Sequence, residues 1–140
     1  MHPDSPLIRH RAERRKRALV ADDNPRMADA MANLIQGSPD FGEVVTARDG
    51  KEAIELAELY APDVIVLDLS MPVIDGLAAA RKIREFMPAV PIVLCTIYGY
   101  ALSVKPAVLN SWGIQAVVNK DQAFSKLVPT LLKLLTTKAA

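Results

Sequence analysis

The sequence predicts an α/β fold in which helices cover both faces of a parallel sheet. Short continuous apolar runs alternate along the chain with segments whose apolar residues recur at helical spacing. Strands that are apolar on both sides are typical of parallel sheets buried between helices. The length of 140 residues suits one domain, and the apolar fraction of 51% excludes a disordered or fibrous chain. We therefore expect five strand-helix units over residues 18–136.

The first half of the domain is expected to hold three strands and two helices. The strands are predicted over residues 18–21, 43–47 and 64–67, and the third is the most β-branched, which favours a central place in the sheet. Asn24 can cap the first helix, and Gly37 ends it. The second helix opens at Asp49 and closes at Pro62.

The second half of the domain is expected to hold two strands and three helices. One helix begins at Asp75 and ends before Pro88, and strands are predicted over residues 91–95 and 114–118. Between those strands we expect a helix within residues 97–113. A final helix follows Asp121, and Pro129 predicts a kink or a late start in it. The side chains expected to face inward from this helix are Phe124, Leu127, Val128, Leu131 and Leu135.

Charge is distributed unevenly along the chain. Residues 1–17 carry six basic and two acidic side chains, a net charge of +4, whereas residues 18–140 carry 11 basic and 14 acidic ones, a net charge of −3. We expect residues 1–17 to form a flexible basic extension and residues 137–140 a short tail. The extension is either a solvated segment without a function or an arm for an acidic partner, a membrane surface, nucleic acid or this chain's own acidic face.

The compartment follows from what the sequence lacks. Cys95 is the single cysteine, which suits a reducing environment. We find neither the apolar core of a signal peptide nor an apolar run long enough to cross a bilayer. The sequence predicts a cytoplasmic protein.

Polar residues with phosphate or metal chemistry follow four of the five predicted strands. Asp22 and Asp23 follow the first, Asp68 the third, Thr96 the fourth and Lys120 the fifth. Ligands of open parallel sheets bind outside the carboxyl ends of the strands, so these side chains are expected to meet. Three carboxylates at one edge repel one another unless a cation lies among them, and oxygen ligands alone favour Mg²⁺.

This combination suits phosphoryl transfer to an aspartate. A carboxylate attacks phosphorus poorly because both are anionic, so the reaction needs a divalent ion, a cation and a hydroxyl donor around the phosphoryl oxygens. Asp22 and Asp23 would bind the metal, and Asp68 would accept the phosphoryl group. Thr96 would supply the hydroxyl donor and Lys120 the cation. No histidine follows a strand, which argues against a Ser-His-Asp hydrolase.

Four segments resemble the receiver domain of two-component response regulators. They are Leu19-Val20-Ala21-Asp22-Asp23-Asn24, residues 64–76 with Asp68-Leu69-Ser70-Met71-Pro72-Val73-Ile74-Asp75-Gly76, Leu94-Cys95-Thr96 and Val117-Val118-Asn119-Lys120. The resemblance covers about residues 17–136. It implies a CheY-like, flavodoxin-like (βα)5 fold with a five-stranded parallel sheet in the order 2-1-3-4-5.

The resemblance also implies a phosphorelay function. Asp68 would accept a phosphoryl group from a sensor histidine kinase or a histidine phosphotransfer protein, in a Mg²⁺-dependent reaction that the chain catalyses on itself without being a turnover enzyme. By the family pattern, Asp23, Asp68 and the carbonyl oxygen of Ser70 would ligate Mg²⁺ directly, and Asp22 mainly through water. Thr96 and Lys120 would contact the phosphoryl oxygens.

The family pattern further implies where partners bind. Kinases would dock on the exposed side of residues 25–36 and near Asp121. The output surface would comprise the helix within 97–113, the strand at 114–118 and the last helix, which can also support a homodimer. Nucleic acid would be a partner only through a further output domain or through the basic extension.

Two departures from the family pattern concern the switch. Val117 stands where the family has a Tyr or Phe that rotates inward, so coupling is expected to be weak or to run through Tyr98 or Tyr100. Ile97 stands where a small residue is usual and would narrow access to Asp68. These departures leave open an alternative, a receiver-fold interaction module that works without phosphorylation. A phosphatase that forms an aspartyl phosphate is disfavoured, because Ser70 stands where such enzymes place a second aspartate.

Overall fold

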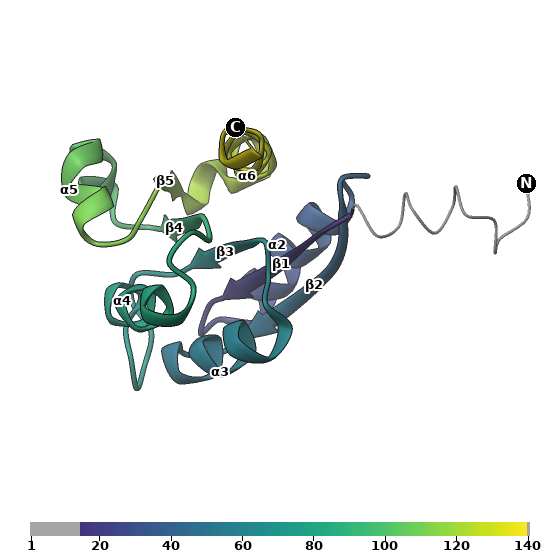
Figure 1. Cartoon of the computed structure of the whole chain (residues 1–140). Coiled ribbons are helices and arrows are strands. Elements are labelled where there is room, and N and C mark those ends of the chain that lie inside the picture. The colour runs from purple at the N-terminus through teal and green to yellow at the C-terminus, as the bar shows by residue number, and fades with distance from the viewer. Residues whose placement is uncertain (1–14, 140) are drawn as a thin grey trace, which may run out of the picture.

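One parallel sheet organises the chain, as the computed structural model of residues 15–139 shows. In this part of the chain the sheet has the order β2-β1-β3-β4-β5, as expected (Figure 1). Its strands are β1 (Lys16–Ala21), β2 (Phe41–Ala47), β3 (Val64–Leu67), β4 (Ile92–Thr96) and β5 (Ala116–Asn119). β3 lies at the centre, and all of its residues are buried. The predicted α/β fold is therefore confirmed.

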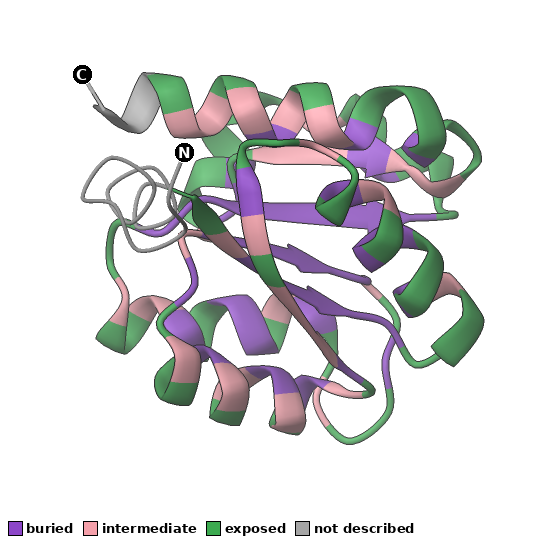
Figure 2. Ribbon diagram, turned by 90° about the vertical axis from the view of Figure 1, so that its right-hand side faces the viewer, coloured by how far each residue is buried: buried purple, intermediate pink, exposed green. Residues whose placement is uncertain are grey.

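Helices cover both faces of this sheet. They are α2 (Pro25–Gln36), α3 (Gly50–Tyr60), α4 (Gly76–Phe86), α5 (Pro106–Ser111) and α6 (Ala123–Ala139), with 3₁₀ turns η1 (Gly99–Ser103) and η2 (Lys120–Gln122). Leu19, Ile65 and Leu94 point to the face that α3, α4 and α5 cover. Val20, Val66 and Cys95 point to the face that α2 and α6 cover. Figure 2 shows the buried strands between these two layers of helices.

Side-chain caps fix where three helices begin. Asn24 accepts hydrogen bonds from the amides of residues 26 and 27 at the start of α2. Asp49 accepts one from the amide of Glu52, and Asp75 accepts one of 2.8 Å from the amide of Ala78. Each cap satisfies amides that have no partner within the helix. The caps place the first turns of α2 and α4 directly behind the ends of β1 and β3.

The two ends of the domain differ from the expected boundaries. β1 begins at Lys16, two residues early, because the amide of Lys16 donates to the carbonyl of Asp40 and the strand already pairs with β2 there. Lys16 and Arg17 thus belong to the sheet, and residues 1–14 of the expected extension lie outside the described residues. α6 runs to Ala139, so most of the expected tail after residue 136 continues the helix.

The segment between β4 and β5 holds the helix expected within residues 97–113, but that helix is short. It contains η1 and the six-residue α5. Val104 and Lys105 are extended between them, because the ring of Pro106 disfavours a helical conformation in the residue before it. Gly113, with φ of +81°, ends the segment. The surface between β4 and β5 therefore consists of short, separately placed pieces.

The inward face of α6 was predicted correctly except at Phe124. Ala123, Leu127 and Leu131 are buried at helical spacing against the sheet. Phe124, the residue after Ala123, does not share this buried face and is 86% exposed. The small Ala123, which directly follows η2, occupies the inner position instead. Pro129 lies well inside α6, so the helix does not start late; the expected kink stays a prediction.

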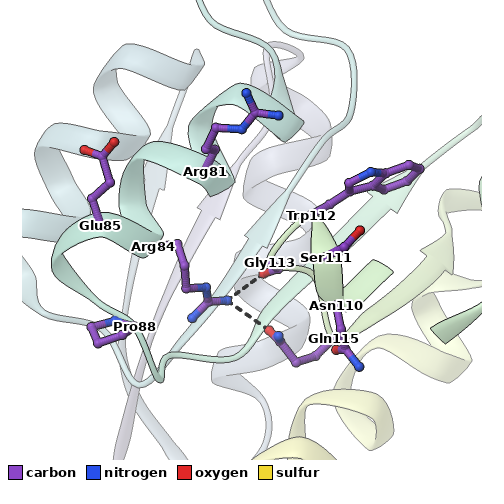
Figure 3. A pocket seen from close by; sticks show the side chains of 9 residues that line it. All are labelled: Arg81, Arg84, Glu85, Pro88, Asn110, Ser111, Trp112, Gly113 and Gln115. Atoms are coloured by element: carbon purple, nitrogen blue, oxygen red, sulfur yellow. Dashed lines mark hydrogen bonds between the residues drawn. The ribbon is translucent and has the colours of Figure 1, made fainter. Parts of the chain in front are cut away.

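Arg84 joins three segments at the edge of the sheet where β4 and β5 begin, opposite the strand-end acids. Figure 3 shows its hydrogen bonds to Gly113 and Gln115. Its Nη1 donates to the carbonyls of Met87 and Val90, at 3.1 and 2.6 Å. Its Nη2 donates to the carbonyl of Gly113 and to Oε1 of Gln115, at 2.6 and 3.1 Å. Arg84 thereby fixes the turn after α5 to the end of α4.

Within residues 15–139, the structure has no helix whose length and apolar character would let it span a membrane.

Candidate phosphoryl-acceptor site

Three carboxylates meet where β1 and β3 end. Asp22 and Asp23 follow β1, Asp68 follows β3, and one carboxylate oxygen from each lies within 4.8 Å of the others. Asp22 is fully buried and Asp68 is 5% exposed, whereas Asp23 faces solvent. The backbone brings them together because β1 and β3 are adjacent and in register, with Ala21 opposite Leu67. The predicted acid cluster is assembled.

Lys120 inserts its ammonium between two of these carboxylates. Its Nζ lies 2.7 Å from Oδ2 of Asp22 and 3.1 Å from Oδ2 of Asp68. Burial lowers the pKa of Lys120, but the attraction of Asp22 and Asp68 outweighs burial, and the net shift is upward. Lys120 is therefore a permanent cation at neutral pH.

The negative charge of the cluster is only partly balanced. Burial raises the pKa of Asp68, against the opposing effect of Lys120. Oδ1 of Asp22 accepts a hydrogen bond from the amide of Asn24, but Oδ2 has only the ion pair with Lys120, without hydrogen-bond geometry. A buried carboxylate oxygen without a hydrogen bond, beside two more carboxylates, is suited to a small divalent cation. The donor set fits Mg²⁺.

These residues line a cavity of about 400 Å³. Its walls are Asp22, Asp23, Asn24, Met27, Asp68, Ser70, Ile97, Tyr98 and Lys120. Ser70 donates its amide to Oδ1 of Asp68 at 3.4 Å, so its backbone lies beside the Asp68 carboxylate. The cavity places Ile97 and Tyr98 at the same opening as the acids, a proximity that the sequence indicated only for Ile97.

Thr96 directly precedes Ile97 and Tyr98, which line this cavity, but Thr96 itself does not line it. It is the last residue of β4 and fully buried, and its Oγ1 accepts a hydrogen bond from the amide of Tyr98 at 3.2 Å. The neighbouring Cys95 is also fully buried, and burial raises the pKa of its thiol to about 12. The hydroxyl hydrogen of Thr96 stays available to donate, but the side chain would have to turn toward the cavity before it could serve a group there.

Gly76 keeps α4 close to the end of β3. A Cβ at Gly76 would lie 2.2 Å from the carbonyl oxygen of Asp68, so no larger residue fits without moving the backbone. Between them, Val73 has φ of +69°, and the amide of Ile74 donates to the carbonyl of Pro72 at 2.8 Å, which closes a tight three-residue turn. The loop after Asp68 is thus tied to the start of α4.

Comparison with known protein families shows which family the chain belongs to. The model of the response regulator receiver domain matches residues 18–132. The chain belongs to the response regulator receiver domain family. Receiver domains are parts of two-component systems and interact in general with histidine kinases or phosphotransfer proteins, and they bind Mg²⁺ at an acidic pocket.

Solved structures support the same assignment. A LuxR-family two-component response regulator from Aurantimonas is 28% identical to this receiver domain, with a TM-score of 0.78 over 88% of this chain and 86% of that one. The response regulator domain of Thermotoga maritima CheB is also 28% identical, with a TM-score of 0.72 over 89% of this chain and 96% of that one.

Curated relatives include several protein-glutamate methylesterase/protein-glutamine glutaminases. The receiver domain is 41% identical over 78 residues to one from Methanospirillum hungatei, which covers 56% of this chain and 22% of the relative. It is 35% identical over 104 residues to one from Myxococcus xanthus, which covers 74% of this chain and 29% of the relative. The similarity therefore spans less than a third of those relatives.

An apolar groove adjoins the acid cavity of the receiver domain. It measures about 500 Å³ and runs between α2 and α6, lined by Met27, Ala30, Met31, Asn33, Leu34, Lys120, Ala123 and Phe124. Met27 and Lys120 belong to both the groove and the acid cavity. The sequence placed a docking surface on residues 25–36 and near Asp121, but it missed Phe124, which it assigned to the core.

The positions expected to act as a switch lie on the β4–β5 side. Val117 is half-buried and packs against the core beneath α3, α4 and α5. Tyr98 and Tyr100 are 39% and 68% exposed, and their ring centroids are 5.8 Å apart. An aromatic pair on the segment after Thr96 thus lies outside the core, while an aliphatic residue occupies the inner position on β5.

Proposed function

We propose that this receiver domain accepts a phosphoryl group on Asp68 from the phosphohistidine of a histidine kinase or a phosphotransfer protein. The observation that carries the proposal is Lys120, whose ammonium lies 3.1 Å from Asp68 within a cluster of three carboxylates. A structural ion pair needs one carboxylate, whereas this site gathers a surplus of negative charge around the residue that would react. Such a surplus is useful where a divalent cation binds.

Mg²⁺ would be held by Asp23, Asp68 and the carbonyl oxygen of Ser70, with Asp22 bound mainly through water. Oδ2 of Asp22 has the ion pair with Lys120 but no contact with hydrogen-bond geometry, so it could also accept from a metal-bound water. When bound, the ion would neutralise charge on the phosphoryl oxygens and so allow one anion to approach another.

Asp68, Lys120 and Thr96 would carry out the transfer of the phosphoryl group. A carboxylate oxygen of Asp68 forms a bond to phosphorus, the bond from phosphorus to the histidine nitrogen breaks, and that nitrogen leaves with the electron pair. Lys120 and Thr96 would donate to the phosphoryl oxygens as the group arrives. The product is a covalent aspartyl phosphate, so in this proposal the domain is a phosphoacceptor that catalyses its own modification and its own dephosphorylation, and not a turnover enzyme.

The signal would then pass through Thr96. In the structure its hydroxyl accepts from Tyr98, and turning the hydroxyl to the phosphoryl group would release that amide. The segment from Ile97 to Lys105 would shift and change the exposed surface of α5, β5 and α6, a population shift between two conformations. We propose this surface for altered protein contacts, including a homodimer.

The apolar groove between α2 and α6 would dock the phosphohistidine partner. It opens beside the acid cavity, and Phe124 gives it an aromatic side chain that is 86% exposed. An exposed aromatic residue in a groove that adjoins the acid cavity is well placed to bind a helix of a partner protein.

Labelling with a phosphodonor tests the proposal. The chain is incubated with Mg²⁺ and acetyl phosphate, or with a phosphorylated histidine phosphotransfer domain, and its intact mass is measured. We expect one phosphoryl adduct that chelation of Mg²⁺ and Asp68→Ala both remove. If neither donor gives an adduct while another receiver domain is labelled, the domain is instead an interaction module that works without phosphorylation.

A further inference from the structure

A second pocket, of about 490 Å³, lies between α4 and the turn after α5, where β4 and β5 begin. Arg81, Arg84 and Glu85 line it from α4, and Trp112 and Gln115 line it from the other side (Figure 3). Its volume is in the range of known ligand sites. It shares no lining residue with the acid cavity or with the groove between α2 and α6. The proposed phosphoryl transfer therefore gives this pocket no role.

The charge of the pocket is positive, although the domain is acidic. Residues 18–140 carry 11 basic and 14 acidic side chains, a net charge of −3. Glu85 is the only acidic residue among the described residues that line the pocket, and its Oε2 already lies 3.3 Å from Nζ of Lys82. In the part of the chain that the structure describes, the guanidiniums of Arg81 and Arg84 form no ion pair. Two such cations in one pocket favour an anionic ligand.

Hydrogen-bond donors outnumber free acceptors in the pocket. Arg84 is already bonded to its four acceptors, but Arg81 forms no hydrogen bond within the described part of the chain. Oε1 of Gln115 accepts from Arg84 and from the amide of Ile92, which leaves the Nε2 group of Gln115 to donate. The indole of Trp112 can only donate. The ligand that completes these bonds is rich in acceptors, as a group of carboxylates is.

Trp112 adds a large apolar surface to this set of donors. It follows the last residue of α5 and is 37% exposed. Figure 3 shows its ring on the α5 side of the pocket and the guanidinium of Arg81 on the α4 side. Trp and Arg are the residues that most often dominate the binding energy of protein interfaces. An indole opposite a guanidinium suits a peptide in which an apolar side chain adjoins a carboxylate.

We propose that this pocket binds an acidic peptide segment of a partner protein, with carboxylates on Arg81 and an apolar side chain on Trp112. A peptide brings a few negative charges to the two guanidiniums alone. A nucleic acid extends its phosphates well beyond the pocket, where the net charge of −3 repels them. This interaction surface lies at the opposite edge of the sheet from Asp68 and needs no phosphoryl group.

Fluorescence tests the proposal directly, because Trp112 is the only tryptophan of the chain. The full chain is titrated with the blocked peptide Glu-Glu-Phe-Leu-Glu-Glu and, separately, with the same peptide carrying Gln in place of each Glu. We expect a saturable change in tryptophan emission with the Glu peptide and none with the Gln peptide. Added salt should weaken the binding, because it screens exposed charges.

Two arginine variants locate the binding site. Arg81→Gln should weaken binding of the Glu peptide about tenfold, which corresponds to about 1.4 kcal/mol. Arg48→Gln is the matched control, because Arg48 is also exposed but does not line the pocket, and it should change the affinity by less than about twofold. The comparison of the two peptides needs no variant, so it stays decisive if Arg81→Gln disturbs the fold.

Several results would overturn the proposal. They are the lack of a saturable change with the Glu peptide, an equal response to the Gln peptide, and equal weakening by the two arginine variants. Tighter binding of a single-stranded oligonucleotide than of the Glu peptide would also overturn it, because nucleic acid would then be the occupant. None of these results bears on phosphoryl transfer to Asp68, since no phosphodonor is present.

Discussion

The ammonium of Lys120 lies 2.7 Å from Oδ2 of Asp22, a carboxylate that solvent does not reach. The two residues come from strands that are not neighbours, since β3 and β4 separate β1 from β5. The ion pair therefore spans the functional edge of the sheet. It also holds Lys120 beside Asp68 before any phosphoryl group is present.

Loss of Lys120 should destabilise the metal-free protein. Removing one partner of a buried ion pair leaves the other charge uncompensated, at a cost of about 3 kcal/mol. We expect Lys120→Met to lower the free energy of unfolding in urea by that amount without Mg²⁺, and by less when Mg²⁺ is added. Lys126→Met, at an exposed position of α6, should change it by less than about 0.5 kcal/mol. Equal effects of the two substitutions would contradict a structural role for the ion pair.

Neutralising Asp68 should stabilise the metal-free protein. Burial raises the pKa of this carboxyl above 3.8, so the folded state binds its proton more tightly than the unfolded state. The ionised form therefore costs stability at neutral pH, and this cost disappears as the pH falls through the raised pKa. We expect Asp68→Asn to raise the midpoint of thermal unfolding at pH 7. The difference from the wild-type chain should shrink as the pH falls toward 3.8; a difference that grows would contradict this account.

Phe124 should matter for transfer from a protein but not for folding. Because Phe124 is 86% exposed, Phe124→Ser should change the free energy of unfolding by less than about 0.5 kcal/mol. Loss of an aromatic docking contact should lower kcat/KM for a phosphotransfer domain about tenfold. Labelling by acetyl phosphate should not change. Leu59→Ser, at a 73% exposed apolar position of α3, is the matched control and should leave both rates unchanged.

Arg84 should contribute strongly to the free energy of unfolding, at the edge of the sheet opposite the acids. Its guanidinium donates to three carbonyls and a side-chain amide oxygen, and burial lowers its pKa without a neighbouring carboxylate to offset the shift. Arg84→Met should cost about 3 kcal/mol, since bonds from charged donors are strong and their acceptors would be left unpaired. Arg81→Met, at an exposed position of the same pocket, should cost less than about 0.5 kcal/mol. Urea unfolding of both variants measures the difference.

The parts of the site that the sequence predicted follow from a simple rule. Parallel strands end at one edge, so Asp22, Asp68 and Lys120 had to meet once their strands were recognised. Helix caps such as Asn24 and Asp75 were also predictable, because a local hydrogen bond decides them.

Other features depend on packing that no local pattern encodes. Phe124 belongs to an apolar stripe, yet Ala123, which directly follows η2, occupies the inner position. Three of the four acceptors of Arg84 are backbone carbonyls, two nearby in the chain at Met87 and Val90 and one far away at Gly113. Backbone carbonyls leave no mark in the residue types. Thr96 lies at the end of β4 but does not line the acid cavity, so its role in the site stays a prediction. Its hydrogen bond to Tyr98 depends on the path of the chain after β4.

The most direct test of the account locates the phosphoryl group. After labelling in the presence of Mg²⁺, reduction with borohydride converts an aspartyl phosphate to homoserine, and peptide mapping identifies the residue. We expect homoserine at position 68 alone, and none when Mg²⁺ is chelated. Homoserine at Asp22 or Asp23, or no homoserine under conditions that label another receiver domain, would contradict it.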